Sequence, residues 1–410
     1  MNPAGHAFRD ELAKLDARSP RHAVEIVDLI LTGARAEGAS DIHLLPSPDG
    51  LTMRWRVDGV LHDLGTIPKA VAPNVVTRLK VMAELLTYKT DVPQEGRVLG
   101  TRDEGEVRVS TFPTLYGEKA VVRLFAASGR FLRLADLGLP DEVRGSLSRL
   151  LGETSGAIVI SGPAGSGKTT TAYACLRELV ESNEGRRSLA TLEDPIEGAV
   201  PGVSQSQVNL AAGFDLATGL RSLMRQDPEV ILVGEVRDRV TAEIAAQASL
   251  TGHLVLTTFH AGSAAGAIGR LLDMGIEPYL VRSGLLAVAS QRLVRALCDC
   301  AAWSDESRGR LGLAVDRYRK PVGCEACRGL GYHGRMVLAE LIEPEPMRLG
   351  PAILERADVR RIESLALAAG MAGRWDRARA ALSEGRTDPA EIRRVLGFSD
   401  DPIDSPGQRS

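Results

Sequence analysis

The stretch AIVISGPAGSGKTTTAYACLRELV, residues 157–180, decides the fold of this chain. A short apolar run leads into a glycine-rich turn, and an amphipathic run follows, so the sequence predicts a strand, a tight loop and a helix. In this context the pattern G-x-x-x-x-G-K-T predicts a phosphate-binding loop. The loop comprises Gly162, Pro163, Ala164, Gly165, Ser166, Gly167, Lys168, Thr169 and Thr170.

Each part of this loop has a physical role in binding a polyphosphate. The glycines allow backbone N–H groups to surround phosphate oxygens, and the N-terminus of the following helix attracts the same negative charge. Lys168 supplies a positive charge for the β- and γ-phosphates, and the Thr169 hydroxyl is placed to ligate Mg²⁺. The sequence therefore predicts that a nucleotide binds here.

Length and composition restrict the class of protein. A chain of 410 residues suffices for two or three domains, and 44% apolar with 25% charged residues is ordinary for a globular protein. The net charge of −3 lacks the overall basic character of a nucleic-acid-binding protein. The sequence contains no apolar run of about 18 residues and no signal-peptide core, so we expect a cytoplasmic protein.

Changes in the sequence pattern predict six parts. Residues 1–20 are expected to be a flexible tail, and residues 21–128 combine helical and strand periodicity, which predicts an α+β amino-terminal domain. Residues 129–290 repeat a strand–turn–helix rhythm, which predicts an α/β core with a parallel sheet. The remaining parts are a cysteine subdomain (291–340), a helical carboxyl-terminal part (341–397) and a disordered tail (398–410).

The amino-terminal domain shows two helical and several alternating segments. Apolar spacing predicts helices at residues 23–36 and 74–87, and alternation predicts a hairpin at residues 107–126. Arg123 ends an alternating strand of this hairpin, shortly before the nucleotide core that begins at residue 129. An exposed arginine is usually solvated, but one at a domain junction can reach a phosphate, and spacing alone leaves both interpretations open.

Three predicted strands of the core each end in a polar side chain suited to nucleotide chemistry. Glu193, Glu235 and His260 follow apolar runs that end at residues 192, 233 and 257. In doubly wound sheets, ligands bind beyond the carboxyl ends of the strands. We therefore expect these three side chains to meet beside Lys168.

Each of these residues suits a step of nucleotide hydrolysis, which needs a carboxylate to polarise water and groups to hold Mg²⁺. Glu235 follows a fully apolar strand and is therefore well positioned to act on the water. Glu193 and Asp194 suit the binding of Mg²⁺ or assistance to the base. For Asp194 or Glu197 the alternative is a cap of the next helix, which carboxylates at strand ends often provide. His260 suits sensing of the γ-phosphate.

Four of the five cysteines form two clusters near the carboxyl end: Cys298 with Cys300, and Cys324 with Cys327. The C-x-x-C pair places two thiolates on one turn, which is typical of structural zinc, and all four residues suit a tetrahedral site. Reduced, unliganded cysteines are the alternative. We expect Zn²⁺ here, and we expect Cys175, within the helix after the phosphate loop, to be a core residue.

The core contains four segments that resemble the Walker A, Asp box, Walker B and His box of the secretion ATPase superfamily: GPAGSGKTT, TLEDPIE, RQDPEVILVGEVRD and TGHLVLTTFHA. The branch with the greatest similarity is that of the type II secretion and type IV pilus assembly ATPases, also called general secretion pathway protein E-like. Further segments are similar to its PAS-like amino-terminal domain: ASDIHLLP, RWRVDGVL, PQEGR and RVSTFPTLYGEKAVVRL. The resemblance covers about residues 21–396 and implies a RecA-like P-loop core.

This resemblance also implies a Mg²⁺-dependent ATPase that works as a homo-hexamer and binds ATP between its two domains. Arg108 and Arg123 would reach the nucleotide from the amino-terminal domain, and Arg221 and Arg225 from the core. Because Arg221 and Arg225 lie four residues apart on one predicted helix face, their spacing alone would also fit a surface ion-pair face.

The resemblance implies a cellular role as well. The motor would power type II secretion pseudopilus or type IV pilus assembly through an inner-membrane platform protein and other assembly components. It would be cytoplasmic and associate peripherally with the inner membrane through these partners, without nucleic acid. Only about twenty residues precede the amino-terminal domain, where secretion-type members usually have a longer region that tethers them to the membrane complex.

Other functions fit parts of the sequence. A pilus retraction motor or a DNA-uptake or conjugation ATPase would share the core, but retraction ATPases generally lack the cysteine module. A nucleic-acid translocase would share the RecA-like fold, but the mild acidity argues against it. A non-catalytic scaffold is opposed by the intact Lys168, Thr169, Glu235 and His260.

The sequence departs from the family pattern at the first cysteine pair. One residue lies between Cys298 and Cys300, where the family has two.

Overall fold

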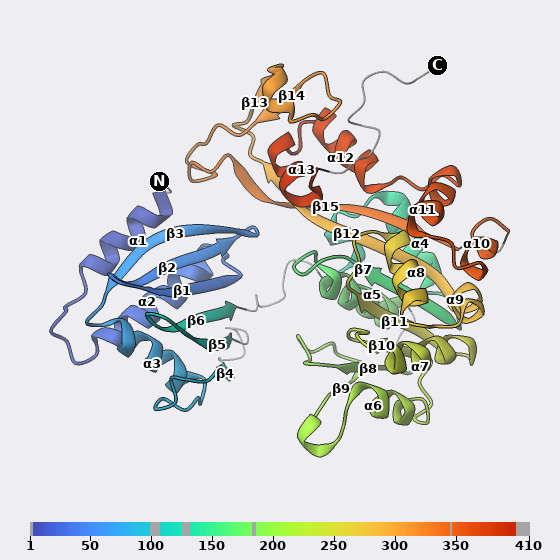
Figure 1. The fold of residues 1–410 in the computed structure, drawn as a ribbon, viewed down its shortest axis with the longest axis horizontal. Coiled ribbons are helices and arrows are strands. Elements are labelled where there is room, and N and C mark those ends of the chain that lie inside the picture. Colours follow the sequence, from blue (N-terminus) through green and yellow to red (C-terminus); the bar gives the residue numbers. More distant parts are fainter. Residues whose placement is uncertain (1–2, 99–106, 125–131, 183–185, 345–346, 399–410) are drawn as a thin grey trace. The chain divides into compact units, whose positions relative to one another are not determined.

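The structure is a computed structural model of the whole chain, and it describes residues 3–98, 107–124, 132–182, 186–344 and 347–398. Contacts divide the chain into two compact units (Figure 1). The N-terminal unit comprises Met1–Ala127, Leu297–Ala302 and Pro321–Gly334. The core unit comprises Ser128–Ala296, Trp303–Lys320 and Arg335–Ser410. Each unit is described separately below.

The N-terminal unit is a six-stranded sheet with helices packed on one face. The strand order is β3-β2-β1-β6-β5-β4. Alternating residues of the strands, such as Ile42, Leu44 and Val122, are fully buried and share one apolar core with the helices. The elements are α1 (Pro3–Ala13), α2 (His22–Ala36), β1 (Asp41–Ser47), β2 (Gly50–Val57), β3 (Val60–Pro68), α3 (Ala72–Met82), β4 (Gln94–Val98), β5 (Val107–Thr114) and β6 (Gly117–Leu124).

The predicted flexible tail over residues 1–20 contains helix α1 instead, which corrects the prediction. Phe8 is buried, and its ring packs edge-on against Trp55 with centroids 4.9 Å apart. Arg9 Nε donates to the Leu64 carbonyl oxygen at 2.8 Å. These two contacts fix a segment whose own periodicity is weak. The predicted disordered tail, residues 398–410, lies outside the described residues except for Phe398.

The second predicted helix of this unit is shorter than expected. Helix α3 ends at Met82, whereas the sequence predicted a helix to residue 87. Glu84 has a φ of 57°, in the left-handed region, so the chain leaves the helical path at this point. The predicted hairpin at residues 107–126 is confirmed in its described part, where β5 and β6 pair antiparallel.

The core unit is built on a seven-stranded sheet with the order β15-β12-β7-β11-β10-β8-β9. Neighbouring strands from β12 to β9 pair in parallel. Every residue of β10 is buried, as a strand covered on both faces requires. The strands are β7 (Gly156–Ser161), β8 (Leu189–Glu193), β9 (Ser204–Gln207), β10 (Val230–Val233), β11 (Leu254–Phe259), β12 (Leu285–Leu297) and β15 (Tyr332–Ile342).

Helices cover both faces of this sheet, and alternate strand residues divide between two apolar cores. Ile158 and Leu232 pack with α4 and α5, while Val159 and Val233 pack with α6 to α9. The helices of the core unit are α4 (Asp141–Leu150), α5 (Lys168–Ser182), α6 (Leu216–Leu223), α7 (Arg239–Leu250), α8 (Ala264–Asp273) and α9 (Pro278–Gly284). The predicted mixed α/β fold with a parallel core sheet is confirmed.

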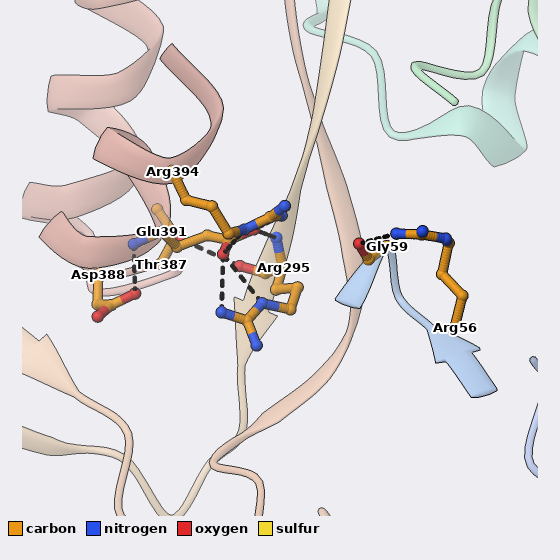
Figure 2. Close-up of polar contacts among 7 residues, drawn as sticks. All are labelled: Arg56, Gly59, Arg295, Thr387, Asp388, Glu391 and Arg394. Atoms are coloured by element: carbon orange, nitrogen blue, oxygen red, sulfur yellow. Dashed lines mark hydrogen bonds and ion pairs between the residues drawn. The ribbon is translucent and has the colours of Figure 1, made fainter. Parts of the chain in front are cut away.

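Between β12 and β15 the chain forms two short strands, β13 (Ala302–Ser304) and β14 (Tyr318–Lys320). After β15 the described chain is mainly helical and contains α10 (Gly350–Leu354), α11 (Val359–Ala368), α12 (Arg374–Ser383) and α13 (Pro389–Leu396). Strand β12 extends past residue 290, where the sequence predicted a domain boundary. Glu391 of α13 binds Arg295 of β12 and Arg394 (Figure 2). Among the described helices, none is long and apolar enough to cross a membrane.

Candidate nucleotide site and cysteine cluster

The phosphate loop connects β7 to the first residue of α5. Gly162 has a φ of 148°, and a Cβ there would lie 2.4 Å from the Gln291 carbonyl oxygen, so only glycine fits. The side chain of Gln291 braces the loop from β12, because its Nε2 donates to the Ser166 carbonyl oxygen at 2.7 Å. Helix α5 begins at Lys168, directly after the loop. Its free N–H groups therefore lie where a phosphate would be attracted.

A pocket of about 190 Å³ opens beside this loop. It gathers residues from the loop and from the carboxyl ends of β8, β10 and β11, as the parallel sheet predicted. Thr170 is exposed on the first turn of α5 and is not part of the pocket wall described here. The wall comprises Ala164, Lys168, Thr169, Glu193, Asp194, Pro195, Glu197, Leu216, Gly234, Glu235, Arg237, Thr258 and His260.

Lys168 is largely buried within this pocket, with 8% of its surface exposed. Its Nζ donates to the Pro163 carbonyl oxygen at 3.0 Å. Burial lowers the pKa of Lys168, and Arg292 lowers it further, while Glu235 acts in the opposite direction. A buried ammonium group with a cationic neighbour gains stability when an anion binds, which suits a phosphate.

Glu235 is held by two basic side chains in the pocket wall. His260 Nε2 lies 3.0 Å from Oε1, and Arg237 Nη2 lies 2.8 Å from Oε2. Burial lowers the pKa of His260, and Lys168 adds to the decrease against the opposing charge of Glu235. The sequence predicted that Glu235 and His260 meet beside Lys168. It assigned no role to Arg237, although a basic residue two positions after the glutamate was the available signal.

Glu193 lies deeper in the wall and is 3% exposed. Its Oε1 accepts hydrogen bonds from Thr191 Oγ1 at 2.6 Å and Gln205 Nε2 at 3.3 Å. Its Oε2 accepts one from the Tyr173 hydroxyl at 2.5 Å. The sequence did not predict that these three neutral donors belong to the site. The adjacent Asp194 also lines the pocket.

Two of the predicted arginines belong to the core unit but not to the pocket wall. Arg221 lies on α6, and Arg225 follows this helix. The Arg225 guanidinium donates to the Arg221 carbonyl oxygen at 2.8 Å and to Ser222 Oγ at 3.3 Å. In the described structure both arginines are thus part of a local group at the end of α6.

The other two predicted arginines belong to the N-terminal unit. Arg108 on β5 and Arg123 on β6 are direct partners in the sheet register, and Arg97 on β4 pairs with Arg108. Arg123 Nε donates to Asp41 Oδ1 at 2.9 Å. A row of basic residues therefore crosses three neighbouring strands, and a carboxylate from β1 contacts one end of it.

The four cysteines Cys298, Cys300, Cys324 and Cys327 form one cluster, with their sulfur atoms all within 4.8 Å of one another. The sulfur atom of Cys324 lies 3.7 Å from those of Cys298 and Cys327, and the sulfur atoms of Cys300 and Cys327 lie 3.8 Å apart. Four sulfur atoms bound tetrahedrally to zinc, with Zn–S bonds of about 2.3 Å, would have nearly this spacing. Burial opposes ionisation of Cys327, but N–H groups of Cys324 and Gly331 lower its pKa to about 6. The donor set therefore fits Zn²⁺ despite the single residue between the first pair.

Comparison with solved structures shows which fold the chain shares with known proteins. The ATPase DotB from Legionella pneumophila shares the fold with a TM-score of 0.65 and 20% identity, over 92% of this chain and 97% of that chain. The structure of the pilus retraction motor PilT with bound ADP has a TM-score of 0.55 and 24% identity, over 90% of this chain and 99% of that chain. Together with the phosphate loop, this likeness shows a RecA-like P-loop fold.

Sequence comparison identifies the family. The family model described as Type II/IV secretion system protein matches residues 16–394. Type II secretion system protein E of Aeromonas hydrophila is 44% identical over 338 residues, which are 80% of this chain and 67% of the relative. Type II secretion system protein HxcR of Pseudomonas aeruginosa is 40% identical over 386 residues, which are 93% of this chain and 79% of the relative. The chain belongs to the Type II/IV secretion system protein family, and the predicted resemblance is confirmed.

Proposed function

We propose that this chain is a Mg²⁺-dependent ATP hydrolase that works as a homo-hexameric motor and powers assembly of a type II secretion pseudopilus or a type IV pilus. One observation carries the catalytic part of the proposal. A single pocket joins Lys168 and Thr169 of the phosphate loop to the carboxylates of Glu193 and Glu235 and to His260. These are the groups that phosphoryl transfer to water requires.

Each side chain of the pocket has a distinct proposed role. Lys168 binds the β- and γ-phosphates, and the Thr169 hydroxyl, with Glu193 and Asp194, suits the binding of Mg²⁺. The bound ion would neutralise charge that develops on the phosphate oxygens. Glu235 orients the attacking water: His260 fixes its Oε1, and Arg237 holds its Oε2 until the γ-phosphate competes for this arginine.

The arginines supply the proposed link between hydrolysis and motion. Arg108 and Arg123 would engage ATP from the amino-terminal domain, with Arg221 and Arg225 from the core. Since Arg123 is paired with Asp41, the phosphates must compete with this carboxylate. Arg56 donates a hydrogen bond to the Gly59 carbonyl oxygen (Figure 2). Its Nε also lies 3.6 Å from Asp41 Oδ2. A contact that ATP makes and ADP does not is what a nucleotide-driven switch needs.

The proposed cellular role follows the relatives, several of which are named type II secretion system protein E. Under this proposal the motor acts in the cytoplasm on an inner-membrane platform protein, and other assembly components connect it peripherally to the membrane. The cysteine cluster, which would hold a structural Zn²⁺, favours the assembly branch over a retraction motor. The system is tested by deleting the gene and measuring secreted protein, surface pili and DNA uptake separately.

The catalytic proposal is tested with Glu235→Gln, which preserves side-chain size and removes the charge. We expect kcat for ATP to fall about 100-fold or more, while a fluorescent ATP analogue still binds. Glu277→Gln is the matched control, because Glu277 is exposed at the start of α9. Unchanged turnover in Glu235→Gln would refute the assigned role and favour a scaffold that binds nucleotide without hydrolysing it.

A further inference from the structure

Tyr173 connects the phosphate-loop helix with the second carboxylate of the pocket. It lies on α5, five residues after Lys168, and only 5% of its surface is exposed. Its hydroxyl donates to Glu193 Oε2 at 2.5 Å and accepts a hydrogen bond from the Glu197 backbone N–H at 3.1 Å. One oxygen atom thus bridges a helix and the segment that follows β8.

The environment of Tyr173 fixes the direction of these hydrogen bonds. Burial raises the pKa of the hydroxyl, and the hydrogen bond and charge of Glu193 raise it further. The hydroxyl therefore keeps its proton and acts as a donor to Glu193. Its lone pairs remain available to the N–H group of Glu197.

Glu193 depends on such donors because it is a buried carboxylate. Burial of a charge is costly unless the charge receives hydrogen bonds or an opposite charge. Thr191 and Gln205 donate to Oε1, whereas Tyr173 donates to Oε2. The hydroxyl of Tyr173 therefore determines how the carboxylate is rotated within the pocket wall.

We propose that Tyr173 is a positioning residue: its hydroxyl fixes the Glu193 carboxylate in the orientation used for hydrolysis and couples it to the helix that begins at Lys168. This inference rests on the proposed function. A phosphate that binds Lys168 acts on the first turn of α5, and Tyr173 lies one to two turns further along the same rigid element. Nucleotide binding and the orientation of Glu193 are thereby connected through one hydrogen bond.

If Tyr173 had only a structural role, its ring and not its hydroxyl would matter, and a different kinetic result would be expected. The ring of Tyr173 belongs to the apolar core formed with Leu176 and Leu179, and Arg177 lies 5.8 Å from its centroid. Tyr173→Phe preserves the ring and removes only the hydroxyl. If the ring alone matters, hydrolysis by this variant equals that of the wild type.

The test is Tyr173→Phe in the full-length chain, with steady-state ATPase kinetics. We expect kcat to fall about tenfold, as the loss of a hydrogen bond to a charged group implies, with KM for ATP within about twofold of wild type. Tyr318→Phe is the matched control, since Tyr318 is equally buried but lies on β14, outside the pocket wall. We expect its kinetics to be unchanged.

A double-mutant cycle distinguishes positioning from a general effect on the fold. If Tyr173 acts through Glu193, then adding Tyr173→Phe to Glu193→Gln causes no further fall in kcat. A wild-type kcat in Tyr173→Phe, or an equal fall in both backgrounds, overturns the inference while Glu235→Gln still supports the proposed function. A wild-type chain that hydrolyses no ATP overturns the proposed function and the inference together.

Discussion

Glu391 anchors the last helix of the core unit to its sheet, and its replacement provides a quantitative test of the structure. The side chain is fully buried. It accepts a hydrogen bond from the Arg295 backbone N–H at 2.8 Å and forms ion pairs with Arg295 and Arg394 at 2.8 and 2.5 Å (Figure 2). Thr387 adds a bond from its hydroxyl to the Arg295 carbonyl oxygen at 2.9 Å. This carboxylate therefore joins helix α13 to strand β12 through both the backbone and the side chain of Arg295.

We expect Glu391→Gln to lower the free energy of unfolding of the core unit by about 2–4 kcal/mol. Removal of one partner from a buried ion pair costs about 3–5 kcal/mol, because the remaining charge is uncompensated. Two features reduce this value. Glutamine still offers an acceptor to the Arg295 N–H, and Arg394 is 40% exposed and can turn to solvent. Most of the lost stability then arises at Arg295, because its side chain is only 18% exposed and keeps an uncompensated charge.

The effect of Glu391 also has a defined pH dependence. Burial opposes ionisation, but hydrogen bonds from Arg394 and Arg295 prevail and lower the pKa of Glu391 below its ordinary value of 4.5. A carboxyl group with a lowered pKa stabilises the fold fully above its pKa in the unfolded chain. It loses this contribution as the pH falls through its folded pKa. The difference between wild type and Glu391→Gln should therefore be complete at pH 7 and diminish below about pH 4.5.

The measurement is urea-induced unfolding followed by circular dichroism, with the transition slope compared between variants. Glu384→Gln is the matched control, because Glu384 pairs with Arg386 at 2.6 Å while both side chains are about half exposed. Such a surface pair contributes about 0–1 kcal/mol. Equal losses in the two variants, or a loss from Glu391→Gln that persists unchanged at pH 3, would refute the reasoning.

Three further outcomes are expected. Phe8→Ala should destabilise the N-terminal unit by about 3–5 kcal/mol, because Phe8 is buried against Trp55; unfolding like that of wild type would refute the packing of α1. Cys300→Ser should abolish bound zinc, measured by metal analysis of the purified chain, whereas Cys175→Ser should keep it. Arg237→Ala should lower kcat about tenfold while an ATP analogue still binds; an unchanged kcat would exclude a role for Arg237 in holding Glu235.

The parts of the fold that the sequence predicted are those with local signals. Strand β10 was predicted at Val230–Val233 and has these bounds, because four consecutive apolar residues follow a proline-containing turn. The meeting of Glu193, Glu235 and His260 followed from one rule, since parallel strands place their carboxyl ends at the same edge. Neither prediction required knowledge of side-chain packing.

The parts that the sequence did not predict depend on contacts between distant residues. Phe8 needs Trp55 to become a core residue, and no periodicity connects them. The donors of Glu193 come from α5, β8 and β9, so their convergence depends on the strand register and on the position of the helix. Arg237 was visible in the sequence, but its hydrogen bonds to Glu235 depend on how the loop after β10 turns.

The charges of the pocket suggest why this arrangement suits a switch. In the structure Lys168 is bound to a backbone carbonyl, and Glu235 is bound to Arg237 and His260. Under the proposed function, the phosphates of ATP compete with Pro163 for Lys168 and with Glu235 for Arg237. Glu235 would then lose one basic partner and gain a free oxygen for water when the γ-phosphate is present. ADP, which lacks this phosphate, would leave the pair intact, so the same residues would report the nucleotide state and act on it.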